Sequence, residues 1–251
     1  ESVALKLSLK NLLKKKKQTF KEIIISDFNI NFDLNKINSY KKIFQEENSL
    51  LPITWKKGQV IFSEKENYIA TVKNINGDLI FEKKYRDYDI KGKFLENNLY
   101  LLFRKDLGKD NPSTKIIFKI PSLDIVAKFD TNNFNNINEI KNGQFLLQKD
   151  KNNFTGIFDY TNNEIKIIKS NLRNYFLDGT VKGKIAIKPF FNFDLNVDLN
   201  SLNFTKIHNY VLSLDEDQKK KLFTINNKIN GNLTLSSNKV YSKHNLVKSF
   251  E

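Results

Sequence analysis

The segment FFNFDLNVDL, residues Phe190 to Leu199, decides the fold class of the chain. Large apolar residues occupy every second position from Phe191 to Leu199, and Asn or Asp fills each position between them. Side chains alternate between the two faces of a strand, so one face is apolar and the other is polar. A helix would distribute the same residues around its whole circumference. The segment is therefore predicted to be a half-buried strand whose apolar face covers a sheet, a helix or an apolar ligand.

The polar positions of this segment allow a second interpretation. Asp194, Asn196, Asp198 and Asn200 have the alternating spacing of the oxygen ligands in a calcium-binding loop. Such a loop needs a glycine for its turn and a bidentate Glu near its end, and both are missing here. We interpret these residues as the solvated face of a strand, and we expect no metal and no cofactor.

The same alternation recurs along most of the chain, in strands that are separated by short polar turns. This pattern favours an antiparallel meander over alternating strands and helices. The predicted fold is mainly β, a long curved antiparallel meander that forms an open apolar groove, with short helices near 36–47 and 202–224. We expect one continuous segment, 1–251, with N-terminal strands and a short helix in 1–50, a meander in 51–170, and C-terminal strands and helices in 171–251.

Local signals predict where individual strands bend or end. A change of face at Ser26–Asp27 predicts a bulge or corner, and Gly58 lies at a predicted bend. Asn76–Gly77–Asp78 has turn chemistry between two apolar runs and predicts a hairpin. Asn97–Asn98 predicts a second turn.

The chain carries a formal net charge of +14, and most of its positive residues are Lys. A cationic surface attracts anionic partners such as lipid head groups or nucleic acid. The arginines are Arg86, Arg104 and Arg173, so the bidentate fork that recognises phosphates and bases is scarce. We expect no nucleic acid partner and interpret most Lys residues as solvated surface. The run Lys14–Lys17 fits either a solvated turn or a head-group contact.

The sequence carries no recognisable catalytic pattern. It has no Cys, which excludes disulfides, thiolate metal sites and Cys nucleophiles. It lacks a Gly-rich phosphate loop and a G-x-S-x-G elbow, and His208 and His244 are far apart without ligand-like neighbours. We expect that the protein is not an enzyme.

Membrane and targeting signals are absent from the sequence. No apolar run approaches the roughly 20 residues that span a bilayer, and the N-terminus does not resemble a signal peptide. Because the chain does not begin with Met, we interpret it as an internal fragment or a processed product. Any membrane anchor is expected outside this segment.

Three stretches resemble the AsmA family, which includes TamB-like and YhdP-like proteins. The first is Val3–Leu34, with a strand, a Leu-Leu turn and the segment EIIISDFNINFDL. The second is WKKGQVIFSEKENYIATVKNINGDLIF, followed by DIKGKF. The third is LDGTVKGKIAIKPFFNFDLNVDLNSLNFTKI, followed by a helical segment and INGNLTLS. Together they cover most of the chain, as patterns of residue class rather than catalytic signatures.

The resemblance implies a protein of the Gram-negative cell envelope, anchored in the inner membrane by an N-terminal helix and extending through the periplasm. It implies a curved β-sheet with an apolar groove and a role in phospholipid transport and outer-membrane homeostasis. The expected function is to bind phospholipid or other acyl lipids and conduct them along the groove between the inner and outer membranes. The expected partners are acyl lipid, the inner membrane through an anchor outside this segment, and other envelope proteins.

The apolar positions of the strands are predicted to line this groove. A lipid chain can replace a second protein layer, because burial of apolar area contributes about 25 cal/mol per Å². The alternative is that these faces pack on each other, which would make the chain a non-catalytic structural or adhesive sandwich or solenoid of the cell surface. The predicted lining residues are Ile90, Phe94, Leu99, Leu101, Ile116, Phe118, Ile125, Ile185, Ile187, Phe191, Phe193, Leu195, Val197, Leu199, Leu233 and Leu235.

Overall fold

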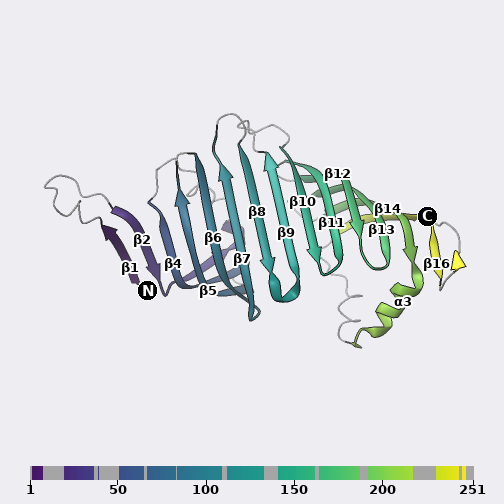
Figure 1. Ribbon diagram of the computed structural model, residues 1–251, viewed down its shortest axis with the longest axis horizontal. Helices are drawn as coiled ribbons and strands as arrows, with labels where there is room; N and C mark the ends of the chain where they lie inside the picture. The colour runs from purple at the N-terminus through teal and green to yellow at the C-terminus, as the bar shows by residue number, and fades with distance from the viewer. Residues whose placement is uncertain are drawn as a thin grey trace. The chain divides into compact units, whose positions relative to one another are not determined.

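The chain is seen in a computed structural model that divides it into two compact units, Glu1–Val126 (unit 1) and Ala127–Glu251 (unit 2). Both units are mainly β and mostly antiparallel, as predicted (Figure 1). The structure describes residues 2–7, 20–36, 39, 51–64, 67–82, 84–108, 112–132, 141–161, 164–186, 192–216, 230–242 and 245–246.

Unit 1 is a sheet in which a strand in two pieces precedes an antiparallel meander. Strand β1 (Ser2–Leu7) pairs antiparallel with β2 (Phe20–Ser26). Both β2 and β3 (Asn29–Asp33) lie parallel to one edge of β4 (Ile53–Glu64), and the short helix η1 (Leu34–Lys36) follows β3. The meander continues from β4 through β5 (Asn67–Phe81), β6 (Tyr85–Phe94), β7 (Asn97–Asp106) and β8 (Ser113–Ile120), and the short helix η2 (Pro121–Leu123) follows.

Unit 2 has a similar construction in the opposite chain order, with the meander first. The antiparallel strands are β10 (Lys141–Lys149), β11 (Asn152–Tyr160), β12 (Glu164–Arg173), β13 (Leu177–Ala186) and β14 (Asn192–Asn203). They are preceded by β9 (Ile125–Asn132), whose first two residues belong to unit 1. Helix α3 (Phe204–Ser213) follows β14. Then β15 (Asn230–Ser237) and β16 (Val240–Ser242) lie parallel to one edge of β14, and β17 (Asn245–Leu246) pairs with β16.

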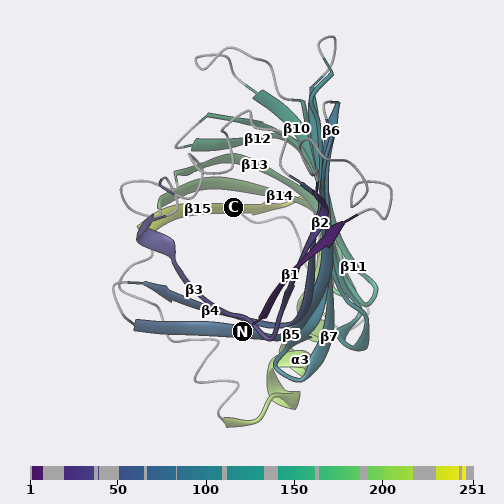
Figure 2. The same ribbon diagram turned by 90° about the vertical axis from the view of Figure 1, so that its left-hand side faces the viewer.

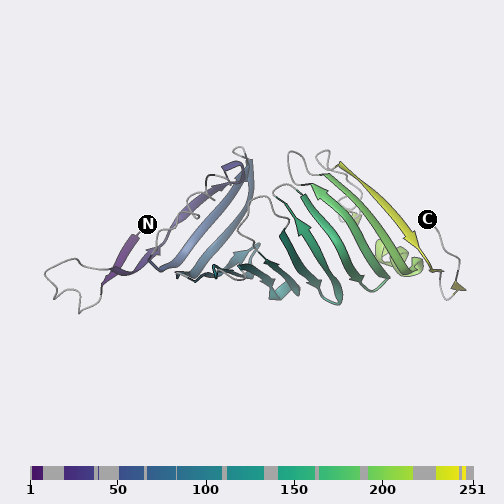
Figure 3. The same cartoon turned by 90° about the horizontal axis from the view of Figure 1, so that it is seen from above.

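Each unit is built as a single layer. The extensive contacts of every described strand are with its neighbours in the sheet (Figures 2 and 3). Helix α3 contacts β16, and its Tyr210 ring lies 5.9 Å from the Phe176 ring, between centroids. The apolar side chains that are buried are therefore buried chiefly by neighbours on the same face of the sheet. They are Phe28, Ile75, Leu79, Leu99 and Ile120 in unit 1, and Phe145, Phe158, Ile167, Val181, Leu199 and Leu202 in unit 2.

The hairpin predicted at Asn76–Gly77–Asp78 is wrong, because β5 continues through this segment to Phe81. Gly77 lies opposite Ile90 of β6, and a Cβ on Gly77 would overlap the carbonyl oxygen of Asp89. This glycine thus permits the close approach of two strands and does not form a turn.

The predicted turn at Asn97–Asn98 is displaced by two residues. Leu95 and Glu96 form the turn between β6 and β7, with φ angles of 48° and 62°. Asn97 is already in β7, and its side-chain amide donates a hydrogen bond of 2.8 Å to the carbonyl oxygen of Leu95. Asn97 therefore does not form the turn itself but stabilises it from the first position of β7.

Two predicted irregularities are confirmed. The break at Ser26–Asp27 separates β2 from β3, and Asp27 has a φ of 53°. The bend at Gly58 is a place where the register between β4 and β5 shifts on both sides of the glycine.

The predicted helix near 202 begins at Phe204, because Leu202 and Asn203 still belong to β14. The side chain of Asn203 accepts a hydrogen bond of 2.9 Å from the amide of Lys206 and so caps the helix. The rest of 202–224 beyond 216, nearly all of 36–47, and Lys14–Lys17 lie outside the described residues.

The meander is not wholly antiparallel, because β4 and β14 each have parallel neighbours. Long connections precede β4 and follow β14, and such lengths allow the crossover that parallel pairing requires. The alternation of apolar residues alone did not distinguish the two directions of pairing.

Candidate functional site

An apolar face runs across the meander of unit 1. The register aligns Ile90 with Leu101 and Leu101 with Phe118, while Leu99 lies opposite Gly92. Directly opposed residues of neighbouring strands lie on the same face of a sheet. The predicted lining residues of this region therefore come together on one face of β6, β7 and β8: Ile90, Phe94, Leu99, Leu101, Ile116 and Phe118.

Aromatic rings extend this face along the same strands. The Tyr88 ring stacks on Phe103 with 5.2 Å between centroids and 12° between planes, and Phe81 lies 5.7 Å from Tyr88. Burial raises the pKa of the Tyr88 phenol above its ordinary value, because apolar surroundings disfavour the phenolate. The three rings form a continuous apolar surface.

A second apolar face covers β13, β14 and β15 of unit 2. Ile185 lies opposite Phe193, and the parallel pairing sets Leu195 beside Leu233 and Val197 beside Leu235. The opening segment is therefore a strand with the predicted alternation. The predicted lining residues that share this face are Ile185, Phe193, Leu195, Val197, Leu199, Leu233 and Leu235.

Glycines on this face let aromatic rings lie against the sheet. A Cβ on Gly156 would be 2.7 Å from the Phe145 ring, and one on Gly143 would be 2.8 Å from the Phe158 ring. These separations are too short for real carbon atoms, so only glycine permits the observed ring positions. The rings consequently lie close to the backbone and form an apolar surface on β10 and β11.

Strand β13 has two local irregularities. At the shift of register with β12, the Ser170 hydroxyl donates to the Val181 carbonyl and accepts from the Val181 amide, each at 2.6 Å. Gly183 has a φ of 138°, and a Cβ there would overlap the carbonyl oxygen of Asp194. The Ser170 hydroxyl thus supplies hydrogen bonds to Val181 where the register shifts, and Gly183 has a backbone conformation and a close approach that favour glycine.

Exposure increases across the apolar face of unit 2 toward β15. Leu199 is 2% exposed, whereas Leu233 on β15 is 61% exposed. Leu195 and Val197 are intermediate. Leu199, and Leu99 in unit 1, thus form the buried base of their faces, and the half-buried and exposed positions are the ones that an apolar ligand could touch.

The structure leaves some predicted positions apart and adds others. Ile125 is half-buried at the start of β9, and Ile187 and Phe191 lie outside the described residues. Residues that share the apolar faces but were not in the predicted set are Tyr88, Phe103, Phe145, Phe154, Phe158, Ile165, Ile167 and Val181. Their alternation within β6, β7 and β10–β13 is the signal that could have identified them.

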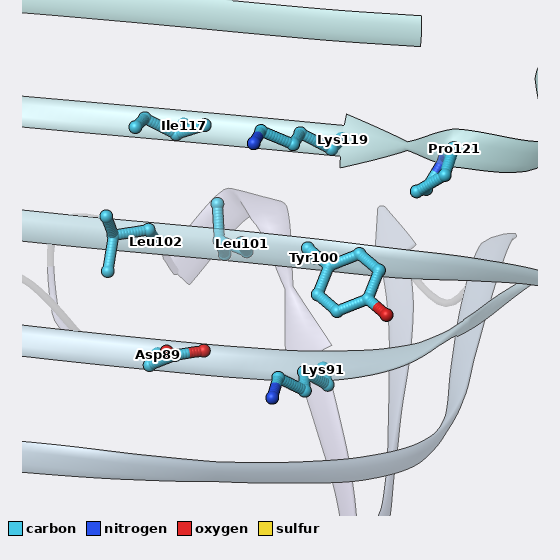
Figure 4. Close-up of a pocket in the computed structure, with 8 residues that line it drawn as sticks. All are labelled: Asp89, Lys91, Tyr100, Leu101, Leu102, Ile117, Lys119 and Pro121. Carbon is cyan, nitrogen blue, oxygen red and sulfur yellow. The ribbon is translucent and has the colours of Figure 1, made fainter. Parts of the chain in front are cut away.

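The opposite face of unit 1 carries a hollow that the sequence did not indicate (Figure 4). We name it the polar-face hollow; its volume is about 430 Å³, and it spans β6–β8 and the start of η2. The Lys91 amine lies 6.0 Å from the centroid of the Tyr100 ring. The lining residues are Asp89, Lys91, Tyr100, Leu102, Ile117, Lys119 and Pro121, together with Leu101, which the register assigns to the apolar face.

The acidic positions of β14 lie on its polar face. Asp194 is opposite Lys184, and Asp198 accepts a hydrogen bond of 2.8 Å from the Ser236 hydroxyl. Among the described residues, no group of three or more His, Asp or Glu side chains could hold a metal ion. In the same part of the chain, no helix has the length and apolarity needed to cross a bilayer.

Comparisons with family models, curated proteins and solved structures found no match to this chain.

Proposed function

We propose that the protein is a lipid-binding module whose apolar sheet faces hold acyl chains and let them move along a groove. In line with the AsmA resemblance, the proposed setting is the periplasm, where the module conducts phospholipid between the inner and outer membranes and supports outer-membrane homeostasis. An anchor outside this segment would hold it at the inner membrane. The proposal includes no catalytic step.

The observation that carries the proposal is an apolar face on a single-layer sheet. In unit 2, Leu195 and Val197 are half-buried and Leu233 is largely exposed, although all three lie on one continuous face. Covering apolar surface of this kind with an apolar partner lowers the free energy of the system.

An acyl chain has the chemistry and shape to cover this face. Each methylene group removed from water contributes about 0.8 kcal/mol, so a chain of lipid length offsets the cost of association. A groove lined by apolar side chains alone selects no particular head group, and this suits the movement of lipids along the strands.

The test compares two charge substitutions on β14. Leu195→Lys places an ammonium on the apolar face, and Asn192→Lys places the same charge on the exposed polar face of the same strand. Lipid that copurifies with the protein is measured by native mass spectrometry and by lipid extraction. We expect Leu195→Lys to lower the bound lipid at least about tenfold, which corresponds to about 1.4 kcal/mol, and Asn192→Lys to leave it unchanged.

Folding of the same variants separates the groove from a closed core. A half-buried Lys can extend its amine to water, so Leu195→Lys should keep a β-type circular dichroism spectrum and a cooperative melt. Global unfolding by this substitution would favour a packed sandwich, since an unpaired charge in a closed core is strongly destabilising. Wild-type protein that carries no lipid and takes up no fluorescent lipid would favour the structural or adhesive module.

A further inference from the structure

The polar face of unit 1 concentrates positive charge at the polar-face hollow. The register places Tyr100 of β7 between Lys91 of β6 and Lys119 of β8, and Lys93 faces Lys73 one step along the strands. Neighbouring strands are about 4.8 Å apart, so Lys91 and Lys119 begin about 10 Å from each other. Within the described part of the chain, no carboxylate lies within ion-pair distance of Lys91, Lys93 or Lys119.

The carboxylates near these lysines lie to one side of them or form only a weak, exposed ion pair. Asp89 lines the hollow on the row of Leu102 and Ile117, next to the row that holds Lys91 and Lys119. Glu96 lies 3.8 Å from Lys73, and both side chains are largely exposed. An anion that enters the hollow is thus drawn to the Lys91–Tyr100–Lys119 row and away from Asp89.

The apolar part of the hollow fits the boundary between lipid head groups and chains. Tyr100 is 40% exposed, and the apolar side chains Leu102, Ile117 and Pro121 also line the hollow. Tyr and Lys are the side chains that place an apolar body in a bilayer surface and a polar end in water. The amines act as point charges. Arg104, on the same face, is paired with Asp87, and none of the described residues that line the hollow is an arginine whose guanidinium fork could select a soluble phosphate.

We propose that this face of β6–β8 docks on the surface of an anionic phospholipid bilayer, with Tyr100 and the hollow at the head-group level. The proposal uses the face opposite to the apolar face, so it does not depend on lipid binding by the groove. Each Lys near an anionic surface contributes about 1 kcal/mol to membrane binding, and the contribution is screened by salt.

The experiment measures cosedimentation with two kinds of vesicles, phosphatidylcholine alone and phosphatidylcholine mixed with phosphatidylglycerol. We expect binding to the mixed vesicles, a decrease with salt, and little binding to phosphatidylcholine alone. The double variant Lys91→Glu/Lys119→Glu should bind at least about tenfold more weakly than the control Lys166→Glu/Lys182→Glu. The control changes the net charge equally at exposed positions on the polar face of unit 2.

Further variants test whether weaker vesicle binding has a cause other than loss of docking through this face. Lys91→Gln/Lys119→Gln removes the charges without reversing them and should weaken binding less than the Glu variant, with an unchanged melt. Tyr100→Ala should weaken binding about threefold or more while the salt dependence is kept. Equal losses in the Glu variant and its control would overturn the proposal in favour of nonspecific attraction by the net charge. Competition by soluble glycerol phosphate would instead identify a site for a free anion and also overturn it.

The result is separable from the test of the groove. Leu195→Lys should retain binding to the mixed vesicles even when it carries no lipid. Loss of vesicle binding in Lys91→Glu/Lys119→Glu, with copurified lipid unchanged, would support docking alone.

Discussion

In both units a strand that pairs in parallel is interrupted, between β2 and β3 in unit 1 and between β15 and β16 in unit 2. The backbone hydrogen bonds at the two breaks are arranged in the same way, but the side chains around them differ. In unit 1 the Asp27 amide donates to the Lys56 carbonyl at 2.9 Å, and the Gln59 amide donates to the Phe28 carbonyl at 2.8 Å. In unit 2 the equivalent bonds join Asn238 to Leu199 at 2.9 Å and Leu202 to Lys239 at 2.8 Å.

The large buried side chains lie at different positions around the two breaks. In unit 1 the interrupted strand supplies Phe28, which is 5% exposed, and the long strand β4 supplies Gly58 beneath its ring. In unit 2 the long strand β14 supplies the buried Leu199, which lies opposite the buried Ser237 of the interrupted strand. The hydrogen bonds match Leu199 with Lys56 and Lys239 with Phe28, so the two units place their large buried residues at different positions around the same backbone geometry.

This difference also changes which side chains each face presents near the break. Phe28 contacts the Trp55 ring at 5.2 Å between centroids and occupies the face of unit 1 with aromatic surface. In unit 2 the hydroxyl of Ser237 donates to the Lys239 carbonyl at 3.1 Å, and the exposed Leu233 and Leu235 precede it. The apolar face of unit 2 therefore has the more exposed leucine surface at its parallel edge.

The largest expected effect is that of Phe28→Ala. Removing a buried aromatic side chain that rests on a glycine leaves a cavity that the backbone cannot fill, so we expect a loss of about 3–5 kcal/mol in the free energy of unfolding. Urea denaturation measures it, with Phe32→Ala on the less buried β3 as the control. A loss below about 1 kcal/mol would contradict the role of Phe28 at the break.

Leu199→Ala tests the large buried residue beside the break in unit 2. We expect a loss of about 2–4 kcal/mol, because Leu199 is buried against Gly179 and its neighbours. Leu233→Ala on the same face should lose less than about 1 kcal/mol, because the side chain is mostly exposed. Equal losses for the two leucines would mean that the face is covered in solution.

A smaller effect is expected at the β1–β2–β4 corner of unit 1. The Thr54 hydroxyl lies 2.5 Å from Glu22 and 2.8 Å from Asp78, and it donates its single proton to one of them. Hydrogen bonding by Thr54, followed by that of Lys6, holds the pKa of Glu22 below its ordinary value of 4.5. A depressed folded-state pKa stabilises the protein above the ordinary pKa, and this stabilisation disappears as the pH falls through the folded-state value.

Glu22→Gln should therefore lower the free energy of unfolding at pH 7 by less than about 1 kcal/mol, seen as a slightly lower urea midpoint, because surface pairs contribute little. The midpoints of the variant and the wild type should converge at acid pH. A difference that is the same at both pH values would show that the carboxylate charge is not responsible.

The alternation of apolar and polar residues predicted the strands well, because the alternating direction of side chains along a strand depends only on neighbouring residues. Phe193, Leu195 and Val197 lie on one face as their spacing requires, and the same holds for Ile90, Leu99 and Leu101. Asn76–Gly77–Asp78 misled the prediction because a glycine that relieves crowding between strands has the same sequence as a glycine in a turn.

Features that depend on distant residues could not be predicted from the sequence. The parallel pairing of β2 and β3 with β4, and of β15 with β14, depends on crossovers that leave no period in the strands. The polar-face hollow arises because Tyr100 and Lys119 come from different strands that the register sets side by side. Neither residue has a local signal that distinguishes it from other exposed positions.

The most direct test of the central claim is lipid photocrosslinking along β14. A photoreactive amino acid is placed in turn at Asp194, Leu195, Asn196 and Val197, and the protein is irradiated with radiolabelled phospholipid. Because successive side chains of this strand alternate between faces, the account predicts crosslinks at Leu195 and Val197 and none at Asp194 and Asn196. Equal labelling at all four positions, or no labelling at Leu195 and Val197, would contradict a lipid-binding apolar face.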